Sequence, residues 1–445
     1  MFVYKFYFFW FIFLIFVIIF DINKERFIFF NQGCRLNHAE TAVLHRHLIS
    51  ANYVAVEDIA LASIVIINTC TVTENGDKDT KRLCRKIQKQ NSQAKIALIG
   101  CQAQILKEKL FDLPNVAWVI GNEDKMLLPE LLKEERLLAT DKIQRTSFTL
   151  PIAGIDHRHV RANLKIQDGC DFYCAFCVIP FARGPARSRV FSDLINEAKI
   201  LVQAGHQELV LTGINLGTYA YESYKILDVV NALEAIDGLK RIRISSIEPT
   251  TIPKELILHM AHPESKLCRY LHIPIQSASD KILKLMNRHY SVQEYREFLN
   301  FCVATVKDVC IGTDIICGFP GEDKAAFDET VANVMTLPWH YAHVFSYSER
   351  TFARSRKLDE QVNVAEIKRR SRILQRLFAA KRLAYQARFL NQKAKVLFEQ
   401  NKNGIWQGLT DHFIKITVKN DTNLRNAFHS VLIKENGSAM QGVLI

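Results

Sequence analysis

One stretch of the sequence reads Leu164-Lys-Ile-Gln-Asp-Gly-Cys-Asp-Phe-Tyr-Cys-Ala-Phe-Cys-Val-Ile-Pro-Phe-Ala-Arg-Gly-Pro-Ala-Arg-Ser-Arg189. Its start predicts a β-strand over 163–167 that ends at a polar turn. Three cysteines, Cys170, Cys174 and Cys177, follow the strand with a C-x3-C-x2-C spacing. Chemically active residues directly after a strand are typical of the active face of a β/α barrel, where the carboxyl ends of the strands meet.

These three cysteines are suited to an iron–sulfur cluster. Three thiolates close in sequence can hold three irons of a four-iron cluster and leave the fourth iron open to another ligand. A structural zinc ion needs a fourth protein ligand, and the residues just downstream offer none. A set of inert buried thiols is disfavoured because Asp168, Gly169 and Asp171 make the turn polar. The spacing therefore predicts a cluster site.

The strand before the cysteines is the first of six predicted strands. Their spacing leaves room for one helix after each strand, which indicates an α/β protein with a central partial (β/α)6 barrel over residues 162–365. The six runs are rich in apolar and β-branched residues, and they are 163–167, 208–211, 241–245, 270–275, 309–316 and 341–345.

The same alternation upstream predicts an N-terminal open doubly wound α/β domain over residues 27–139. A linker follows at 140–161, where Pro151 and Gly154 interrupt mixed polar residues. The predicted strands of this domain are 27–30, 64–68, 95–99 and 116–120, and the predicted helices are 37–49, 75–90 and 103–110.

Three further cysteines, Cys34, Cys70 and Cys101, lie far apart in sequence, but each closely follows a predicted strand of the first domain. Ligands of an open α/β sheet gather beyond the carboxyl ends of its strands, so these thiols are candidates for a second metal site. Because the three cysteines lie far apart in sequence, the alternative is that they occupy unrelated positions and form no common site. For the other five cysteines we expect small buried hydrophobic roles; these are Cys84, Cys268, Cys302, Cys310 and Cys317.

The C-terminal part of the chain predicts a basic helix over 366–390 and then a small antiparallel β-barrel over 391–445. The helix carries eight Lys and Arg residues with no acidic residue after Glu366. Such a run is either a binding surface for a polyanion or a solvated helix face. Turn signals at Asn403-Gly404 and Asn436-Gly437 separate short strand-like runs in the tail, as in a five-stranded barrel.

Composition narrows the class of protein. Of the 445 residues, 49% are hydrophobic and 23% are charged, which excludes disorder, collagen and a protein with many membrane spans. The net charge of +12 indicates a polyanionic partner. Eleven cysteines are too few for a secreted disulfide scaffold, and their number is odd, so we expect a reducing compartment with some cysteines as ligands.

Residues 1–26 form a separate apolar extension. The run from Phe6 to Phe20 is unbroken by a polar residue. It is shorter than the roughly 20 residues that a membrane span needs, and polar residues follow it where a signal peptide would have a small-residue cleavage site. Three interpretations stay open: a misassigned start, which we favour, a membrane anchor and a signal peptide.

The quoted stretch closely resembles the radical S-adenosylmethionine methylthiotransferases, and most of all those that act on N6-threonylcarbamoyladenosine at position 37 of tRNA. In the first domain the resemblance is carried by Gln32-Gly-Cys-Arg-Leu-Asn37, Ile67-Asn-Thr-Cys-Thr-Val-Thr73 and Ile99-Gly-Cys-Gln-Ala-Gln104. In the barrel it is carried by Leu211-Thr-Gly-Ile-Asn-Leu-Gly217, Arg243-Ile-Ser-Ser-Ile-Glu-Pro249, His272-Ile-Pro-Ile-Gln-Ser277 and Gly312-Thr-Asp-Ile-Ile-Cys-Gly-Phe-Pro-Gly-Glu322. The tail resembles the TRAM-like RNA-binding β-barrel of these enzymes, so the resemblance covers residues 27–445.

The resemblance implies two [4Fe-4S] clusters and S-adenosylmethionine. Cys170, Cys174 and Cys177 would hold the cluster that binds S-adenosylmethionine and releases methionine and a 5′-deoxyadenosyl radical. The first-domain cysteines would hold an auxiliary cluster that carries the sulfur. The radical would remove hydrogen from C2 of the adenine, and a second S-adenosylmethionine would supply the methyl group. No catalytic residue beyond the six cysteines is predicted; they are Cys34, Cys70, Cys101, Cys170, Cys174 and Cys177.

The resemblance also implies cofactor-binding roles for five barrel residues. Phe176 would pack against the adenine of S-adenosylmethionine, with a core aromatic as its alternative role. Gly213 would let the methionine amino group approach the backbone, with a plain turn glycine as the alternative. Polar groups at strand ends would bind ribose or substrate, or else cap helices; they are Glu248, Gln276 and Asp314.

As partners the resemblance implies the tRNA anticodon stem-loop, a flavodoxin- or ferredoxin-like electron donor and a sulfur donor, in the cytoplasm. Three arginines of the loop after the cysteines, Arg183, Arg187 and Arg189, would bind RNA phosphates or the threonylcarbamoyl carboxylate, with a solvated loop as the alternative. The basic helix would contact the RNA backbone through Arg369, Arg372 and Arg376.

Two alternatives remain open from the sequence. In the first alternative the same chemistry acts on isopentenyladenosine at the same tRNA position or on an aspartate of a ribosomal protein. The cysteine motifs do not distinguish between these targets. An iron–sulfur protein that binds RNA and senses redox state is the non-enzymatic alternative.

Overall fold

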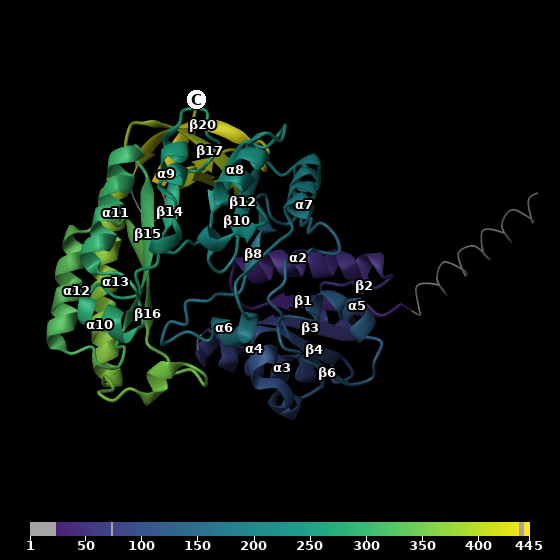
Figure 1. The fold of residues 1–445 in the computed structure, drawn as a ribbon. Coiled ribbons are helices and arrows are strands. Elements are labelled where there is room, and N and C mark those ends of the chain that lie inside the picture. The colour runs from purple at the N-terminus through teal and green to yellow at the C-terminus, as the bar shows by residue number, and fades with distance from the viewer. Residues whose placement is uncertain (1–23, 73, 436–439) are drawn as a thin grey trace, which may run out of the picture.

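The computed structural model describes residues 24–72, 74–435 and 440–445, and it has three parts along the chain (Figure 1). An α/β part with a parallel sheet comes first, a half-barrel of alternating strands and helices follows, and a small β-barrel ends the chain. In Figure 1 the terminal barrel, in yellow, lies at one end of the half-barrel, and the first part, in purple and blue, lies beside the other end.

The helices are α2 (Arg35–Ser50), α3 (Glu74–Gln90), α4 (Cys101–Leu106), α5 (Leu128–Leu131), α6 (Ile179–Arg183), α7 (Phe191–Gln203), α8 (Ile226–Glu234), α9 (Lys254–Ala261), α10 (Asp280–Leu285), α11 (Val292–Thr305), α12 (Lys324–Thr336) and α13 (Val364–Ala387). The strands of the first part are β1 (Arg26–Asn31), β2 (Val54–Ala55), β3 (Ile64–Thr69), β4 (Lys95–Gly100), β5 (Val116–Ile120) and β6 (Leu137–Ala139). The strands of the half-barrel region are β7 (Ala162–Lys165), β8 (Gln167–Asp168), β9 (Arg187–Ser188), β10 (Glu208–Thr212), β11 (Ala220–Tyr221), β12 (Tyr224–Lys225), β13 (Arg241–Ile244), β14 (Tyr270–His272), β15 (Cys310–Cys317) and β16 (Tyr341–Ser346). The strands of the terminal barrel are β17 (Lys393–Lys402), β18 (Ile405–Thr410), β19 (Lys415–Lys419), β20 (Phe428–Glu435) and β21 (Met440–Leu444).

The first sheet has the strand order β2-β1-β3-β4-β5-β6, and all its pairs are parallel. Alternate residues of β3 enter different cores: Val65 and Ile67 pack on one face, and Ile64 and Ile66 pack on the other. A parallel sheet buried on both faces reads as a continuous apolar run, as residues 64–67 do. The predicted doubly wound architecture is confirmed, with two short edge strands, β2 and β6, that were not predicted.

The half-barrel contains all six predicted strands in chain order. Parallel pairs join β7, β10 and β13 into one sheet and β14, β15 and β16 into another. A single parallel bridge between Ile242 and Leu267 links the two sheets. Helix α2 of the first part packs against β7, which places the two cysteine-bearing parts side by side.

The terminal barrel is closed, with the order β17-β18-β19-β21-β20. Four of its five pairs are antiparallel, but β19 and β21 run parallel, with Ile416 opposite Met440. The predicted small five-stranded barrel is therefore confirmed, with one parallel pair among its antiparallel pairs. A closed ring with an odd number of strands cannot alternate direction throughout, so at least one pair must be parallel.

Among the described residues, no helix has both the length and the apolar character needed to cross a membrane. The apolar run at 6–20 lies outside the described residues, as does the predicted turn at 436–437. The domain boundaries drawn from the sequence stay predictions.

Candidate active site

The loop that carries Cys170, Cys174 and Cys177 is packed at its start against Gly184 and Pro185. Gly169 has φ +69°, and a β-carbon there would lie 1.9 Å from the carbonyl oxygen of Pro185. The backbone N–H of Cys170 donates to Gly184 across 3.1 Å. The loop therefore needs glycine at 169, because a side chain would collide with the backbone of Gly184 and Pro185.

The three thiols lie together and fit a cluster with three cysteine ligands. Burial and the neighbouring Cys174 raise the pKa of Cys170 to about 11, and burial with Cys174 and Cys170 raises that of Cys177. Nη1 of Arg288 donates to Sγ of Cys174 across 3.4 Å. A bound cation would turn these thiols into thiolates, since metal ligation requires deprotonation. The donor set therefore suits a four-iron cluster with one open iron.

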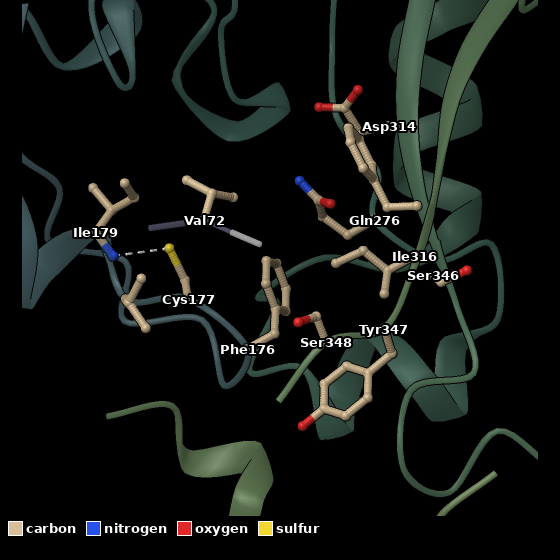
Figure 2. Close-up of a pocket in the computed structure, with 12 residues that line it drawn as sticks. Val72, Phe176, Cys177, Ile179, Gln276, Asp314, Ile316, Ser346, Tyr347 and Ser348 are labelled. Atoms are coloured by element: carbon tan, nitrogen blue, oxygen red, sulfur yellow. Dashed lines mark hydrogen bonds between the residues drawn. The ribbon is translucent and has the colours of Figure 1, made fainter. Parts of the chain in front are cut away.

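A cavity of about 250 Å³ opens beside Cys177 (Figure 2). Phe176 and Ile316 give it apolar walls, and Gln276 and Asp314 add an amide and a carboxylate. Gln276 has φ +72°, a conformation that costs free energy for a residue with a side chain. Its backbone is held by two hydrogen bonds with β15, one from its own N–H to Asp314 and one from the N–H of Ile316. The cavity combines a flat aromatic wall with polar groups at one side, as a nucleoside ligand requires.

Two of the predicted cofactor residues lie elsewhere. Glu248 is ion-paired with Arg288, with one contact of 3.0 Å. It therefore acts on the cysteine loop through Arg288, which contacts Cys174. Gly213 lines a different, larger cavity.

Cys34, Cys70 and Cys101 converge at the carboxyl edge of the first sheet, after the adjacent strands β1, β3 and β4. A β-carbon on Gly33 would lie 3.3 Å from Cβ of Cys70, so the two loops touch. Burial, with added contributions from Cys101 and Cys34, raises the pKa of Cys70 to about 11. This edge lies where the chain turns from one side of the sheet to the other, the usual place for ligands in such folds. The three thiols fit a second cluster.

The larger cavity has a volume of about 610 Å³ and lies between the three parts of the protein. Cys34 and Arg35 line it from the first part, and Phe413 lines it from the terminal barrel. Asp314 lines both this cavity and the one beside Cys177, so the two cysteine sets open onto adjoining spaces. Further half-barrel residues complete its wall, including Gly213, Tyr270, His272 and His343.

A buried charge network lies beneath the first-domain cysteines. Arg183 donates to Glu40 and to Asp168, and Lys165 donates to the same two carboxylates at 2.7 and 2.6 Å. Nζ of Lys125 lies 2.5 Å from Glu40. Three cations thus face two carboxylates, and all five side chains are buried. Burial raises the pKa of Cys34, and the positive charge of Arg183 opposes part of that rise. Asn37 connects the network to Cys34, because its Oδ1 accepts from both Arg183 and Sγ of Cys34.

These pairings correct the prediction that the loop arginines contact RNA. Arg183 and Arg189 have side chains only 1% exposed, and Arg189 pairs with Asp193 and Glu197. A phosphate cannot reach them without breaking a buried ion pair. Arg187 pairs with Glu123 across 2.9 Å and is 9% exposed, so its RNA contact stays a prediction.

The predicted arginines of α13 lie on its solvent face. Arg369, Arg372 and Arg376 are exposed, whereas Arg370 turns inward to Glu322 and Glu366. The exposed positions are free of burial and suit electrostatic contact with a polyanion. Their role in RNA binding stays a prediction.

Sequence reasoning missed several residues of the site. Glu40, Lys125 and Lys165 carry no local signal, because their partners are distant in the chain. Arg288 was missed for the same reason. Arg35 did carry a signal, since it directly follows Cys34.

Two protein-family models match parts of this chain. Residues 164–334 match the Radical SAM superfamily, and residues 26–121 match Uncharacterized protein family UPF0004. The superfamily implies a [4Fe-4S] cluster and S-adenosylmethionine. A solved radical S-adenosylmethionine methyltransferase, TsrM from Kitasatospora setae, has the same fold with a TM-score of 0.55 at 14% identity, covering 73% of this chain and 75% of that one.

Curated relatives share much more sequence. Threonylcarbamoyladenosine tRNA methylthiotransferase MtaB of Aquifex aeolicus is 34% identical, over 86% of this chain and 94% of that protein. The protein of the same name in Bacillus subtilis is 33% identical, over 92% and 94%. A tRNA-2-methylthio-N(6)-dimethylallyladenosine synthase of Thermodesulfovibrio yellowstonii is 30% identical, over 74% and 78%. With both cysteine sets in place, the chain belongs to the radical S-adenosylmethionine methylthiotransferases.

Proposed function

We propose that this enzyme methylthiolates C2 of N6-threonylcarbamoyladenosine at position 37 of tRNA. Two relatives that match over most of their length carry that activity in their names. The observation that carries the proposal is that one cysteine of each set lines a cavity, Cys177 the smaller one and Cys34 the larger one, and that Asp314 and Phe345 line both cavities. A reaction that removes hydrogen on one side and adds sulfur on the other needs this arrangement, because the reacting carbon must reach both centres.

The six cysteines hold two [4Fe-4S] clusters in this proposal, Cys170, Cys174 and Cys177 one of them and the first-domain cysteines the other. When bound, the clusters and S-adenosylmethionine supply the radical, the sulfur and the methyl group. Phe176 packs against the adenine of S-adenosylmethionine, while Gln276 and Asp314 accept or donate hydrogen bonds at its polar edge. Glu248 positions Arg288, and Arg288 orients the thiolate of Cys174.

The RNA is bound outside these cavities, by the exposed arginines of α13 and by the terminal barrel. Base 37 of an anticodon loop is reached only when it leaves the stack and enters the enzyme. Gly213 and Tyr270 then line the space that receives the base. The proposal places the enzyme in the cytoplasm, where a flavodoxin- or ferredoxin-like protein supplies electrons and a separate donor supplies sulfur.

Nucleoside mass spectrometry of tRNA from a deletion strain tests the proposal. We expect 2-methylthio-N6-threonylcarbamoyladenosine to disappear, with its unthiolated precursor in its place. Genes encoding Cys34→Ala or Cys170→Ala should not restore it. A gene encoding Cys302→Ala is the matched control, because Cys302 is buried in the half-barrel core away from both sites.

Other outcomes identify the alternatives. Loss of the methylthio group from isopentenyladenosine, or from an aspartate of a ribosomal protein, assigns the same chemistry to a different target. An unchanged tRNA and ribosome, with no 5′-deoxyadenosine formed by the reconstituted protein, points to an iron–sulfur redox sensor instead.

A further inference from the structure

Arg35 places a cationic side chain in the wall of the larger cavity. It is the first residue of α2, directly after Cys34, and its half-buried side chain lines the 610 Å³ space. Within residues 24–72, 74–435 and 440–445, its side chain makes no hydrogen bond or ion pair. A partly buried guanidinium normally has an anionic or hydrogen-bonding partner, since its desolvation is otherwise costly.

The cations near Arg35 already have carboxylate partners. Nε of Arg161 lies 2.5 Å from Glu399, and Nε of Arg243 lies 2.8 Å from Glu208. The positive charge that the cavity leaves uncompensated is therefore at Arg35, and the cavity is built to receive an anion there.

The position of Arg35 favours an anion on the base over one on the RNA backbone. The cavity has the size of a small-ligand site, so a flipped nucleoside enters it and the phosphates stay at its mouth. Arg35 directly follows Cys34, and both residues line the cavity that receives the reacting base in the proposed function. Of the groups on the proposed substrate base, the threonylcarbamoyl substituent brings a carboxylate into this cavity.

We propose that Arg35 binds the carboxylate of the threonylcarbamoyl group, and so selects this nucleoside over one with an uncharged N6 substituent. This inference rests on the proposed function and names the residue that reads its substrate. A planar guanidinium can hold a carboxylate through two parallel hydrogen bonds. An isopentenyl group would leave Arg35 without a partner, and sites built for a polar group reject analogues that lack it.

Equilibrium binding of three RNAs tests the inference. They are anticodon stem-loops of one sequence that carry at position 37 the threonylcarbamoyl group, its neutral methyl ester or an isopentenyl group. The wild-type protein should bind the acid about 10- to 100-fold more tightly than the ester. Arg35→Gln should bring that ratio to about 1, and Arg35→Lys should keep part of it, because lysine retains the charge without the fork geometry.

Arg372→Gln on α13 is the matched control: it removes one exposed cation and should weaken all three RNAs equally, leaving the ratio unchanged. Equal wild-type affinity for acid and ester would overturn the inference without any variant. An Arg35→Gln protein that loses affinity for all three RNAs alike would also overturn it, since that result marks a phosphate contact. If Arg35→Gln does not fold, the inference is tested by the ratio of the affinities for the acid and ester RNAs in the wild type and in Arg35→Lys.

The proposed function is tested separately on the same RNAs. Wild-type enzyme, reconstituted anaerobically with S-adenosylmethionine and dithionite, should methylthiolate the acid RNA. If product forms but the wild-type protein binds the acid RNA no more tightly than the ester RNA, the role of Arg35 is overturned and the proposed reaction is not. A preference without product supports the role of Arg35 in binding and overturns the proposed reaction.

Discussion

The guanidinium of Arg183 makes two hydrogen bonds, of 3.0 and 3.1 Å, with the carboxylate of Glu40. Arg183 ends the short helix after the half-barrel cysteines, and Glu40 lies on α2 of the first part, six residues after Cys34. Neither side chain is more than 1% exposed. This pair therefore joins the two cysteine-bearing parts and fixes the distance between their sites.

Arg183→Met should destabilise the protein by about 3–5 kcal/mol, because it leaves two buried carboxylates with reduced compensation. The midpoint of unfolding in urea measures the loss. Arg145→Met is the matched control. Its partner, Asp171, lies 2.7 Å away, but the two side chains are 63% and 39% exposed, so the loss of stability should be much smaller than in Arg183→Met. Equal costs for the two variants would contradict a special role for the buried pair.

His340 should make stability depend on pH. Burial, with Arg388 and Lys381 nearby, lowers its pKa to about 3, and its Nδ1 accepts a hydrogen bond of 2.9 Å from the N–H of Ile311. The unfolded chain takes up a proton near pH 6.5, while the folded protein does not do so until about pH 3. The stabilising contribution is therefore complete above pH 6.5 and is lost as pH falls, by roughly 2 kcal/mol at pH 5.

His340→Asn keeps an acceptor for Ile311 but does not titrate, so the difference in stability between pH 7 and pH 5 should shrink by that amount. His262→Asn, at an exposed position, is the control and should leave the difference unchanged. Urea titrations at the two pH values measure both. An unaltered pH dependence in His340→Asn would show that other groups cause it.

Much of the fold follows from the sequence because its strands carry strong local signals. Residues 64–67 are all buried and read as an unbroken apolar run, and β10 of the half-barrel is likewise buried along its whole length. The cysteines could be placed because they follow strands directly. The edge strands β2 and β6 have two and three residues, too few to show a period.

The loop arginines show what the sequence cannot supply. Arg183 and Arg189 have the charge and the Gly-Pro context of a phosphate-binding loop, and only their partners exclude that role. The partner Glu40 lies 143 residues away from Arg183 in the chain. Charge is visible in a sequence, whereas compensation of charge depends on tertiary contacts. Arg35 has no ion-pair partner among the described residues, yet its charge alone does not distinguish it in the sequence from Arg183 and Arg189.

Gly169→Ala should remove the iron held by Cys170, Cys174 and Cys177. The substitution combines a strained φ of +69° with a β-carbon 1.9 Å from the backbone at Pro185, so the loop must move. The iron content of the reconstituted protein should fall by about half, and the electron paramagnetic resonance signal of that cluster should be lost. Gly404→Ala separates the effect of the positive φ from that of the collision, because Gly404 has φ +77° and no atom of the described residues lies within 4 Å of the added carbon. It should cost about 1–2 kcal/mol of stability and no iron.

The basic helix α13 should provide RNA affinity that depends on salt and not on the modified base. Replacing Arg369, Arg372 and Arg376 by glutamine removes three exposed cations from one face. Each phosphate contact contributes about 0.7 to the slope of log K against log salt for single-stranded RNA, so the slope should fall by about 2. Affinity should drop by the same factor for RNA with and without the threonylcarbamoyl group.

Helix α3 of the first part offers a control with equal charge. Lys81, Arg85 and Lys89 are exposed, so their replacement by glutamine changes the net charge of the protein by the same three units. If long-range charge alone held the RNA, both triple variants would lose affinity and slope alike. We expect the α3 variant to keep nearly the full slope, because counterion release requires phosphates in contact with the cations. A larger loss of RNA affinity and salt slope in the α3 variant would show that the RNA contacts the first part of the protein and not α13.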